Sequence, residues 1–121
     1  MLYSGIYLHR RLIVICTMNN EGTVVTRTRM KTEPDAVVTY FRQWTEPHHA
    51  VVECTSNWYW LCDQLRSLGI VVVLAHAKYL KAISYAKVKT GAIDAHTLAQ
   101  LLHMGFVPEA HQLPPAHGDG T

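Results

Sequence analysis

The stretch SGIYLHRRLIVICTMNNEG, residues 4–22, contains two apolar segments separated by a short basic break. Apolar, β-branched and aromatic side chains dominate residues 2–8 and again residues 12–18, as is typical of two neighbouring strands. The basic pair Arg10-Arg11 separates the two runs, and the turn sequence NNEG, residues 19–22, ends the second. The chain is therefore expected to open with a hairpin of two apolar strands.

The residues that follow predict a third strand of the same antiparallel sheet. Between Thr23 and Lys31 the side chains alternate, with three basic residues on one side and Thr26, Thr28 and Met30 on the other. The basic residues are Arg27, Arg29 and Lys31. This alternation indicates a strand with one buried and one exposed face.

Helical and strand patterns then alternate. Residues 32–35, TEPD, combine a capping hydroxyl, early acids and a proline, and predict the start of a helix. That helix is expected to run through Val37, Val38, Phe41 and Trp44. Residues 49–53 predict a short strand that ends in Glu53. A second helix is then expected, capped by Ser56 or Asn57, with apolar residues at Trp58, Leu61, Leu65 and Leu68 and with Gly69 after its end.

The run IVVVLA, residues 70–75, is apolar without alternation. Such a run indicates a strand covered on both faces, hence a parallel strand inside an α/β sheet. A basic segment, residues 76–90, leads to a last helix expected from about Ile93 to Met104 and ended by Gly105. Residues 108–121 are rich in Pro, Gly and His and are expected to be a disordered tail, so that the domain spans residues 1–107.

The predicted order β-β-β-α-β-α-β-α is the element order of the ribonuclease-H-like fold. In that fold a mixed five-stranded sheet carries helices on both faces. A chain of 121 residues with 49% hydrophobic and 17% charged residues has the composition of one globular domain of this kind.

Charge is distributed unevenly, although the net charge of +2 is too small to indicate a nucleic-acid partner by itself. Residues 64–93 contain no acid, and residues 1–32 contain only one, Glu21. The basic residues of the longer segment are Arg66, Lys78, Lys81, Lys87 and Lys89. Two interpretations stay open, a face that binds nucleic acid and an ordinary solvated surface.

The cysteines and the N-terminus predict a location. Cys16, Cys54 and Cys62 form no CxxC pair, and an odd number of cysteines fits a reducing compartment. No charged segment precedes the first apolar run, and no apolar run approaches the ~20 residues of a membrane span. A cytoplasmic protein without a membrane partner is therefore expected.

Three blocks of the sequence resemble motifs of the DEDD transposases, the bridge-RNA-guided recombinases of bacterial insertion sequences, which are related to Piv-type DNA invertases. The blocks are GIYLHRR, VVECTSNWYWLCDQL and VVVLAHAKYLKAISYAKVKTGAIDAHTLAQLL. The resemblance covers residues 3 to about 110. It implies a RuvC-like N-terminal domain, whereas the family's second domain, which bears a nucleophilic serine, is absent from these 121 residues.

The resemblance also assigns four acid positions. Glu53 in ECTSNW matches the second acid of the family, and Asp94 in KTGAIDA matches the fourth. Tyr7 stands where the first Asp is expected, and Gly91 stands where the third is expected. Taken without the resemblance, Glu53 is an exposed acid at a strand end, and Asp94 is a residue that complements a helix N-terminus.

The two missing acids bear on metal binding. Family members are expected to use Mg²⁺, which prefers carboxylate and water ligands, and a neutral phenol or a glycine replaces neither. Glu53 and Asp94 are therefore expected to bind Mg²⁺ weakly at most, without phosphodiester chemistry. His9, His76, His96 and His103 lack the spacing of a metal site and are expected at the surface or partly buried. Trp58 is expected in the core, and Trp60 could lie in the core or stack on bases.

Three functions remain open. The first is a truncated, degenerate transposase domain, inactive by itself. The second is a module that binds DNA or guide RNA through Lys78, Lys81, Lys87, Lys89, Arg27 and Arg29, or that pairs with a second copy or with an intact recombinase as an inhibitor. The third is an active metal-dependent nuclease.

Overall fold

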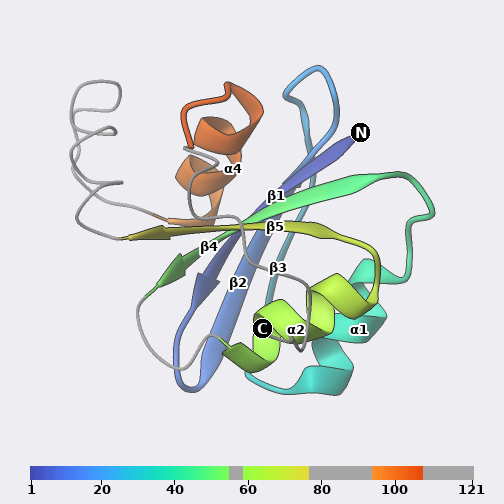
Figure 1. Cartoon of the computed structure of the whole chain (residues 1–121), viewed down its shortest axis with the longest axis vertical. Coiled ribbons are helices and arrows are strands. Elements are labelled where there is room, and N and C mark those ends of the chain that lie inside the picture. The colour runs from blue at the N-terminus through green and yellow to red at the C-terminus, as the bar shows by residue number, and fades with distance from the viewer. Residues whose placement is uncertain (55–58, 77–93, 108–121) are drawn as a thin grey trace, which may run out of the picture.

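A computed structural model describes residues 1–54, 59–76 and 94–107 of the chain (Figure 1). Within them, five strands form one sheet: β1 (Leu2–Leu8), β2 (Leu12–Met18), β3 (Val24–Lys31), β4 (His48–Cys54) and β5 (Val71–His76). The helices are α1 (Pro34–Phe41), α2 (Tyr59–Ser67) and α4 (Ala95–His103). The expected tail, the four lysines of the basic segment, Gly91 and Trp58 lie outside the described residues.

The sheet is mixed, with strand order β3-β2-β1-β4-β5. β1 pairs antiparallel with β2, and β2 pairs antiparallel with β3, as the hairpin and the alternating third strand predict. β4 pairs parallel with β1, and β5 pairs parallel with β4. The predicted mixed five-stranded sheet is therefore confirmed.

The position of β5 differs from the prediction of a strand inside the sheet. Among the described strands it lies at one end of the sheet, beside β4 alone. Its two faces are nevertheless covered, because Val72 and Leu74 are buried on one side while Val73 and Ala75 are buried on the other. A continuous apolar run thus indicates covered faces, but it does not distinguish a central strand from one at the edge.

Helices cover both faces of the sheet, as predicted (Figure 1). On one face, α1 and α2 pack over the larger core cluster, which includes Ile6, Ile15 and Val52. On the other face, α4 packs over β1 and β2 and buries residues such as Leu98 and Ala99. Trp60 is half-buried against the α1/α2 core.

Three helix ends differ from the predictions. Thr32 does not cap α1, because its hydroxyl donates to the carbonyl of His9, and Glu33 occupies the N-cap position without a side-chain hydrogen bond. α1 ends at Phe41, before Trp44. α4 begins at Ala95 rather than near Ile93, with Asp94 as its N-cap.

Gly5 allows α4 to lie directly against β1. A Cβ atom built on Gly5 would collide with the carbonyl oxygen of Ala95 and the amide nitrogen of Ala99, and it would lie 2.7 Å from Cβ of Leu98. The first two obstacles are helix backbone, which no rotamer change can remove. The absence of a side chain at Gly5 therefore fixes how closely α4 approaches the sheet.

A chain of four hydrogen-bonded polar side chains crosses the opposite face. Oγ of Ser4 lies 2.6 Å from Nε2 of His48 and 2.6 Å from the hydroxyl of Thr17, which lies 2.7 Å from the hydroxyl of Tyr40. All four residues are buried. The chain ties β1, β2, β4 and α1 together through groups that would each cost free energy if they were buried without a partner.

These buried groups have shifted pKa values. Burial, with smaller effects of His49 and the N-terminal amine, lowers the pKa of His48 to about 4. Burial raises the pKa of Tyr40 to about 12, partly offset by hydrogen bonds from Thr17 and Thr26. Both side chains are therefore neutral at pH 7 in the folded protein.

No helix in the described residues is long and apolar enough to cross a membrane.

We predict that Gly5→Ala destabilises the fold by about 2 kcal/mol or more, because overpacking against rigid backbone forces α4 away from the sheet. Urea unfolding measures the loss, and faster amide exchange at Leu98 and Ala99 would locate it. Gly69→Ala is the control, because Gly69 has φ of 80° but open space around it. Its expected cost is backbone strain of about 1 kcal/mol. Equal losses for the two variants would contradict the close approach of α4.

We also predict that stability falls with acid through His48. The unfolded state binds a proton near pH 6.5 and the folded state only near pH 4. Stability is therefore full above pH 6.5 and is lost as the pH falls toward 4, by up to about 3 kcal/mol, since one pKa unit corresponds to about 1.4 kcal/mol.

The comparison is with His48→Gln, which keeps a hydrogen-bonding group beside Ser4 but does not titrate. Urea unfolding at pH 7, 5.5 and 4.5 should show a steeper loss for the parent than for the variant. If the variant does not fold, the ring resonances of His48 in the parent, followed by NMR, should still report a neutral imidazole at pH 5.5. Parallel stability curves, or a ring that is charged at pH 5.5, would contradict the prediction.

Candidate functional site

The candidate site lies on the α4 face of the sheet, where β1 ends and α4 begins. Tyr7 is half-buried and packs against the cluster that contains Cys16 and Ala95, whereas its neighbours Ile6 and Leu8 belong to the α1/α2 core. The side chain of Tyr7 therefore points toward α4. Together with four other residues it lines a pocket of about 280 Å³. Those residues are Val14, Arg29, Asp94 and Ala95.

Glu53 lies beside Tyr7 in the sheet. Ile6 of β1 pairs with Val52 of β4 in a parallel register, so the next position along the two strands places Tyr7 beside Glu53. Val51 packs on the α4 face and Val52 on the opposite face, so alternation directs Glu53 to the α4 face. Glu53 is only 5% exposed, which differs from an exposed acid at a strand end.

The structure thus brings Tyr7 and Asp94 to one pocket and places Glu53 beside Tyr7 on the same face. Gly91, the remaining acid position of the resemblance, lies outside the described residues. The role of these positions in metal binding stays a prediction.

Asp94 has a structural task as well as a place in the pocket. Its Oδ1 accepts a hydrogen bond of 2.9 Å from the backbone N–H of Thr97 and so caps α4. Partial burial raises the pKa of the carboxyl, but hydrogen bonds from Thr97 and the nearby His96 outweigh burial, so that the net effect is a lowered pKa. Asp94 is therefore a carboxylate at neutral pH, as a helix cap favours.

The residues of the site do not fit a two-ion magnesium centre. Such a centre requires several carboxylates around ions about 4 Å apart. Here the pocket presents the phenol of Tyr7 and the guanidinium of Arg29 beside Asp94, and Arg29 is a permanent cation that repels a divalent ion. In the described ranges no three His, Cys, Asp or Glu side chains are grouped as a metal site. His103 instead bonds through Nε2 to the carbonyl of Asn20, at 2.8 Å.

A row of exposed cations runs along β3 on the same face as the pocket. Val14 of β2 pairs with Arg29, and Cys16 pairs with Arg27, so both arginines share the face of the residues they pair with. The third cation, Lys31, pairs with Leu12 near the exposed Arg10-Arg11 turn. α4 packs over β1 and β2, which leaves the row on β3 open to solvent. We refer to Arg27, Arg29 and Lys31 as the β3 basic row.

Arg27 also affects a neighbouring thiol. Burial raises the pKa of Cys16, while the charge and hydrogen bond of Arg27 oppose that increase. Cys16 is 1% exposed, as is typical of a free cysteine, which behaves as a small hydrophobic residue.

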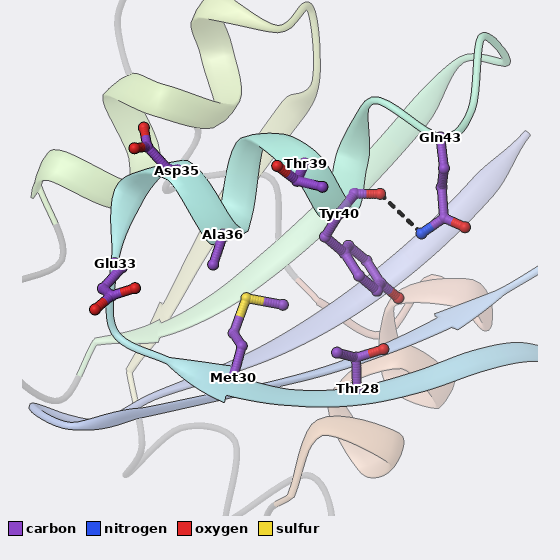
Figure 2. A pocket seen from close by; sticks show the side chains of 8 residues that line it. All are labelled: Thr28, Met30, Glu33, Asp35, Ala36, Thr39, Tyr40 and Gln43. Carbon is purple, nitrogen blue, oxygen red and sulfur yellow. Dashed lines mark hydrogen bonds between the residues drawn. The ribbon is translucent and has the colours of Figure 1, made fainter.

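A larger hollow of about 670 Å³ lies on the other face, between β3 and α1 (Figure 2). Met30, Ala36 and Tyr40 line its interior, and the acids Glu33 and Asp35 lie at its rim (Figure 2). None of the predicted site residues that the structure describes lines it. Its acidic rim is unfavourable for a phosphate backbone, so the candidate site remains the smaller pocket beside the β3 basic row.

Sequence reasoning did not single out the buried polar chain or the role of Arg29 in the pocket. Ser4 and Thr17 are polar residues inside apolar strands, which was the available signal for the chain. The alternation of β3 predicts that Arg29 lies on an exposed face. No local pattern could show that Arg29 and Asp94 line the same pocket.

Solved structures of similar fold were found. The chain is similar to Thermus thermophilus RuvC in complex with a Holliday junction substrate, with 12% identity over 88% of this chain and 98% of that chain and a TM-score of 0.60. It is also similar to another structure of Thermus thermophilus RuvC, with 14% identity over 97% of this chain and 86% of that chain and a TM-score of 0.54. At these identities the similarity shows the fold, which is the RuvC-like fold of the ribonuclease-H class. No protein-family model matches the chain. No curated protein matches it either.

We predict that a carboxylate at position 7 creates a magnesium site that the parent lacks. In Tyr7→Asp/Arg29→Gln the new carboxylate lies beside Glu53 in the sheet and shares the pocket with Asp94, and the repelling cation is gone, so Mg²⁺ should bind with a Kd on the order of a millimolar. Calorimetric titration measures binding, with Tyr7→Phe/Arg29→Gln as the matched control. If neither variant binds Mg²⁺, the acids of β4 and α4 do not converge on position 7.

Proposed function

We propose that this chain is a non-catalytic nucleic-acid-binding domain with a RuvC-like fold, whose magnesium centre has been replaced by a site that binds nucleic acid without cutting it. The observation that carries the proposal is the position of Arg29. This cation lies both in the pocket with Tyr7 and Asp94 and in the middle of the β3 basic row.

The first argument concerns chemistry. Phosphodiester cleavage by a two-ion centre depends on carboxylates that hold the ions against the phosphate. Tyr7 supplies no charge at the first acid position, and Arg29 adds a positive charge to the same pocket. The β3 basic row, to which Arg29 belongs, attracts a phosphate backbone, but the pocket does not present the set of carboxylates that holds two ions against a phosphate.

The second argument concerns the arrangement of the cations. Alternate residues of a strand point to the same face and are spaced about 7 Å apart. Arg27, Arg29 and Lys31 therefore form a straight row of three cations, to which the Arg10-Arg11 turn adds charge near the end of the row marked by Lys31. An extended phosphate backbone can follow such a row, and each neutralised phosphate releases counterions, which favours binding at low salt.

The proposed origin is the N-terminal domain of a DEDD-type transposase. The three motif blocks support this origin, and the RuvC-like fold is the one that the resemblance implies. DNA is the first polymer to test, because the similar RuvC structure holds a Holliday junction substrate. Guide RNA and association with an intact recombinase or a second copy of the chain are further proposals of the same origin.

The test is salt-dependent binding to fluorescently labelled single-stranded and duplex DNA and to RNA, measured by anisotropy between 50 and 200 mM salt. The parent should bind with a Kd of about 10⁻⁴–10⁻⁶ M at physiological salt, as non-specific contacts do. Arg27→Gln/Lys31→Gln should weaken binding and reduce the salt slope by about two units, about one for each lost phosphate contact.

The matched control is Arg42→Gln/Arg66→Gln. It removes the same number of positive charges, one at the C-cap of α1 and one in the last turn of α2, and these helices cover the opposite face. If both double variants weaken binding equally, net charge and not the β3 basic row determines affinity. If the parent shows no salt-dependent binding, the proposed function is wrong and an inert remnant of a transposase is the better description.

A further inference from the structure

We infer that the pocket between Tyr7 and Asp94 takes one unpaired guanine base of the bound strand. This inference rests on the proposed function, which supplies the nucleic acid, and it goes beyond that function by assigning a base to the pocket and a role to each residue that lines it.

The walls of the pocket suit a flat group of limited size. Val14, Ala95 and the half-buried ring of Tyr7 provide apolar surface, and the volume is about 280 Å³. A nucleobase has two apolar faces and stacks on aromatic rings irrespective of its sequence. The pocket is therefore suited to a base rather than to the phosphate or the sugar.

The two charged residues exclude simple ions. Asp94 is a carboxylate and repels a phosphate that would enter the pocket, whereas Arg29 repels a metal ion or an ammonium group. A neutral ligand that offers acceptors to Arg29 and donors to Asp94 satisfies both residues at once. The carboxylate of Asp94 already accepts hydrogen bonds from Thr97, and its remaining lone pairs can accept from a ligand.

Guanine meets this demand better than the other bases. Its N7 and O6 are adjacent acceptors, and an arginine bonded to both is the commonest specific contact in protein–DNA recognition. Its N1–H and exocyclic amino group are adjacent donors, which a carboxylate can accept. Thymine has a single N–H donor, and adenine and cytosine have a single amino group each, so they leave Asp94 or Arg29 less well paired.

The β3 basic row gives the strand a path past the pocket. Arg27 and Lys31 flank Arg29 on the same face, so phosphates on either side of the inserted nucleotide can pair with them. Reading N1–H and the amino group requires a base whose pairing edge is free. Single-stranded DNA or an unpaired nucleotide is therefore the expected ligand, and a perfect duplex is not.

The experiment compares twelve-nucleotide oligothymidine with the same strand carrying one central guanine, adenine, cytosine or inosine. Anisotropy at 100 mM salt should show five- to tenfold tighter binding of the guanine strand than of oligothymidine. Inosine, which lacks the exocyclic amino group, should lose part of that preference. The readout is the ratio of the two affinities, which a general loss of binding does not change.

Asp94→Asn tests the carboxylate. Asparagine caps a helix about as well as aspartate, so α4 should persist, but the acceptor pair and its charge are lost. The guanine preference should fall below twofold. Asp63→Asn is the matched control, because Asp63 is an exposed carboxylate on α2, and it should leave the preference unchanged.

Three results would overturn the inference, and they have different meanings. Salt-dependent binding without a preference for guanine would remove the base pocket and leave the proposed function intact. A guanine preference that survives Asp94→Asn would place the base elsewhere on the protein. The absence of all binding by the parent would remove the proposed function and the inference together.

Discussion

The close approach of α4 to β1 at Gly5 is the constraint on which the α4 face depends. A side chain at this position would meet helix backbone, so the helix can lie where it does because β1 has a glycine there. Two consequences follow from this one contact. Leu98, Ala99 and Leu101 are buried against the sheet, and Asp94 at the start of the helix is held opposite Tyr7.

The two faces of the sheet serve different purposes. The α1/α2 face holds the larger apolar core and the hydrogen-bonded chain from His48 to Tyr40, in which four polar groups satisfy one another away from water. A network of this kind favours one register of β1, β2 and β4, because a shift would leave buried groups without partners. On the other face, α4 covers β1 and β2 but leaves β3 open. The exposed cations of β3 and the pocket beside them are therefore accessible to a ligand.

The electrostatics of the pocket explain how a nuclease-like fold can favour a different ligand. In a magnesium centre, carboxylates make the site strongly negative and the ions reverse that sign toward the phosphate. Here Asp94 supplies one carboxylate, which also caps α4, while Tyr7 supplies an aromatic ring and Arg29 supplies a positive charge. The result is a site with one carboxylate and one guanidinium beside an aromatic ring, which is suited to a neutral ligand with donors and acceptors.

Local patterns in the sequence predict the strands, their order along the chain and the faces to which the side chains of β3 point. Apolar runs predict β1 and β2, and the two-residue period predicts β3. Gly69 predicts the end of α2, where it adopts a left-handed conformation. These features are local, because each depends on residues a few positions apart. The resemblance added positions 7, 53 and 94, but no pattern along the chain could show which cation lies beside them.

Packing between distant elements sets the features that local patterns leave open. It placed β5 at an end of the described sheet and used Thr32 to bond to His9 instead of capping α1. It also joined Ser4 to His48, 44 residues away, and placed Arg29 and Asp94 in one pocket. Contacts of this kind depend on how α4 and α1 pack against opposite faces. That packing depends on the steric fit of the whole core, and it cannot be predicted from the periodicity of a single strand or helix.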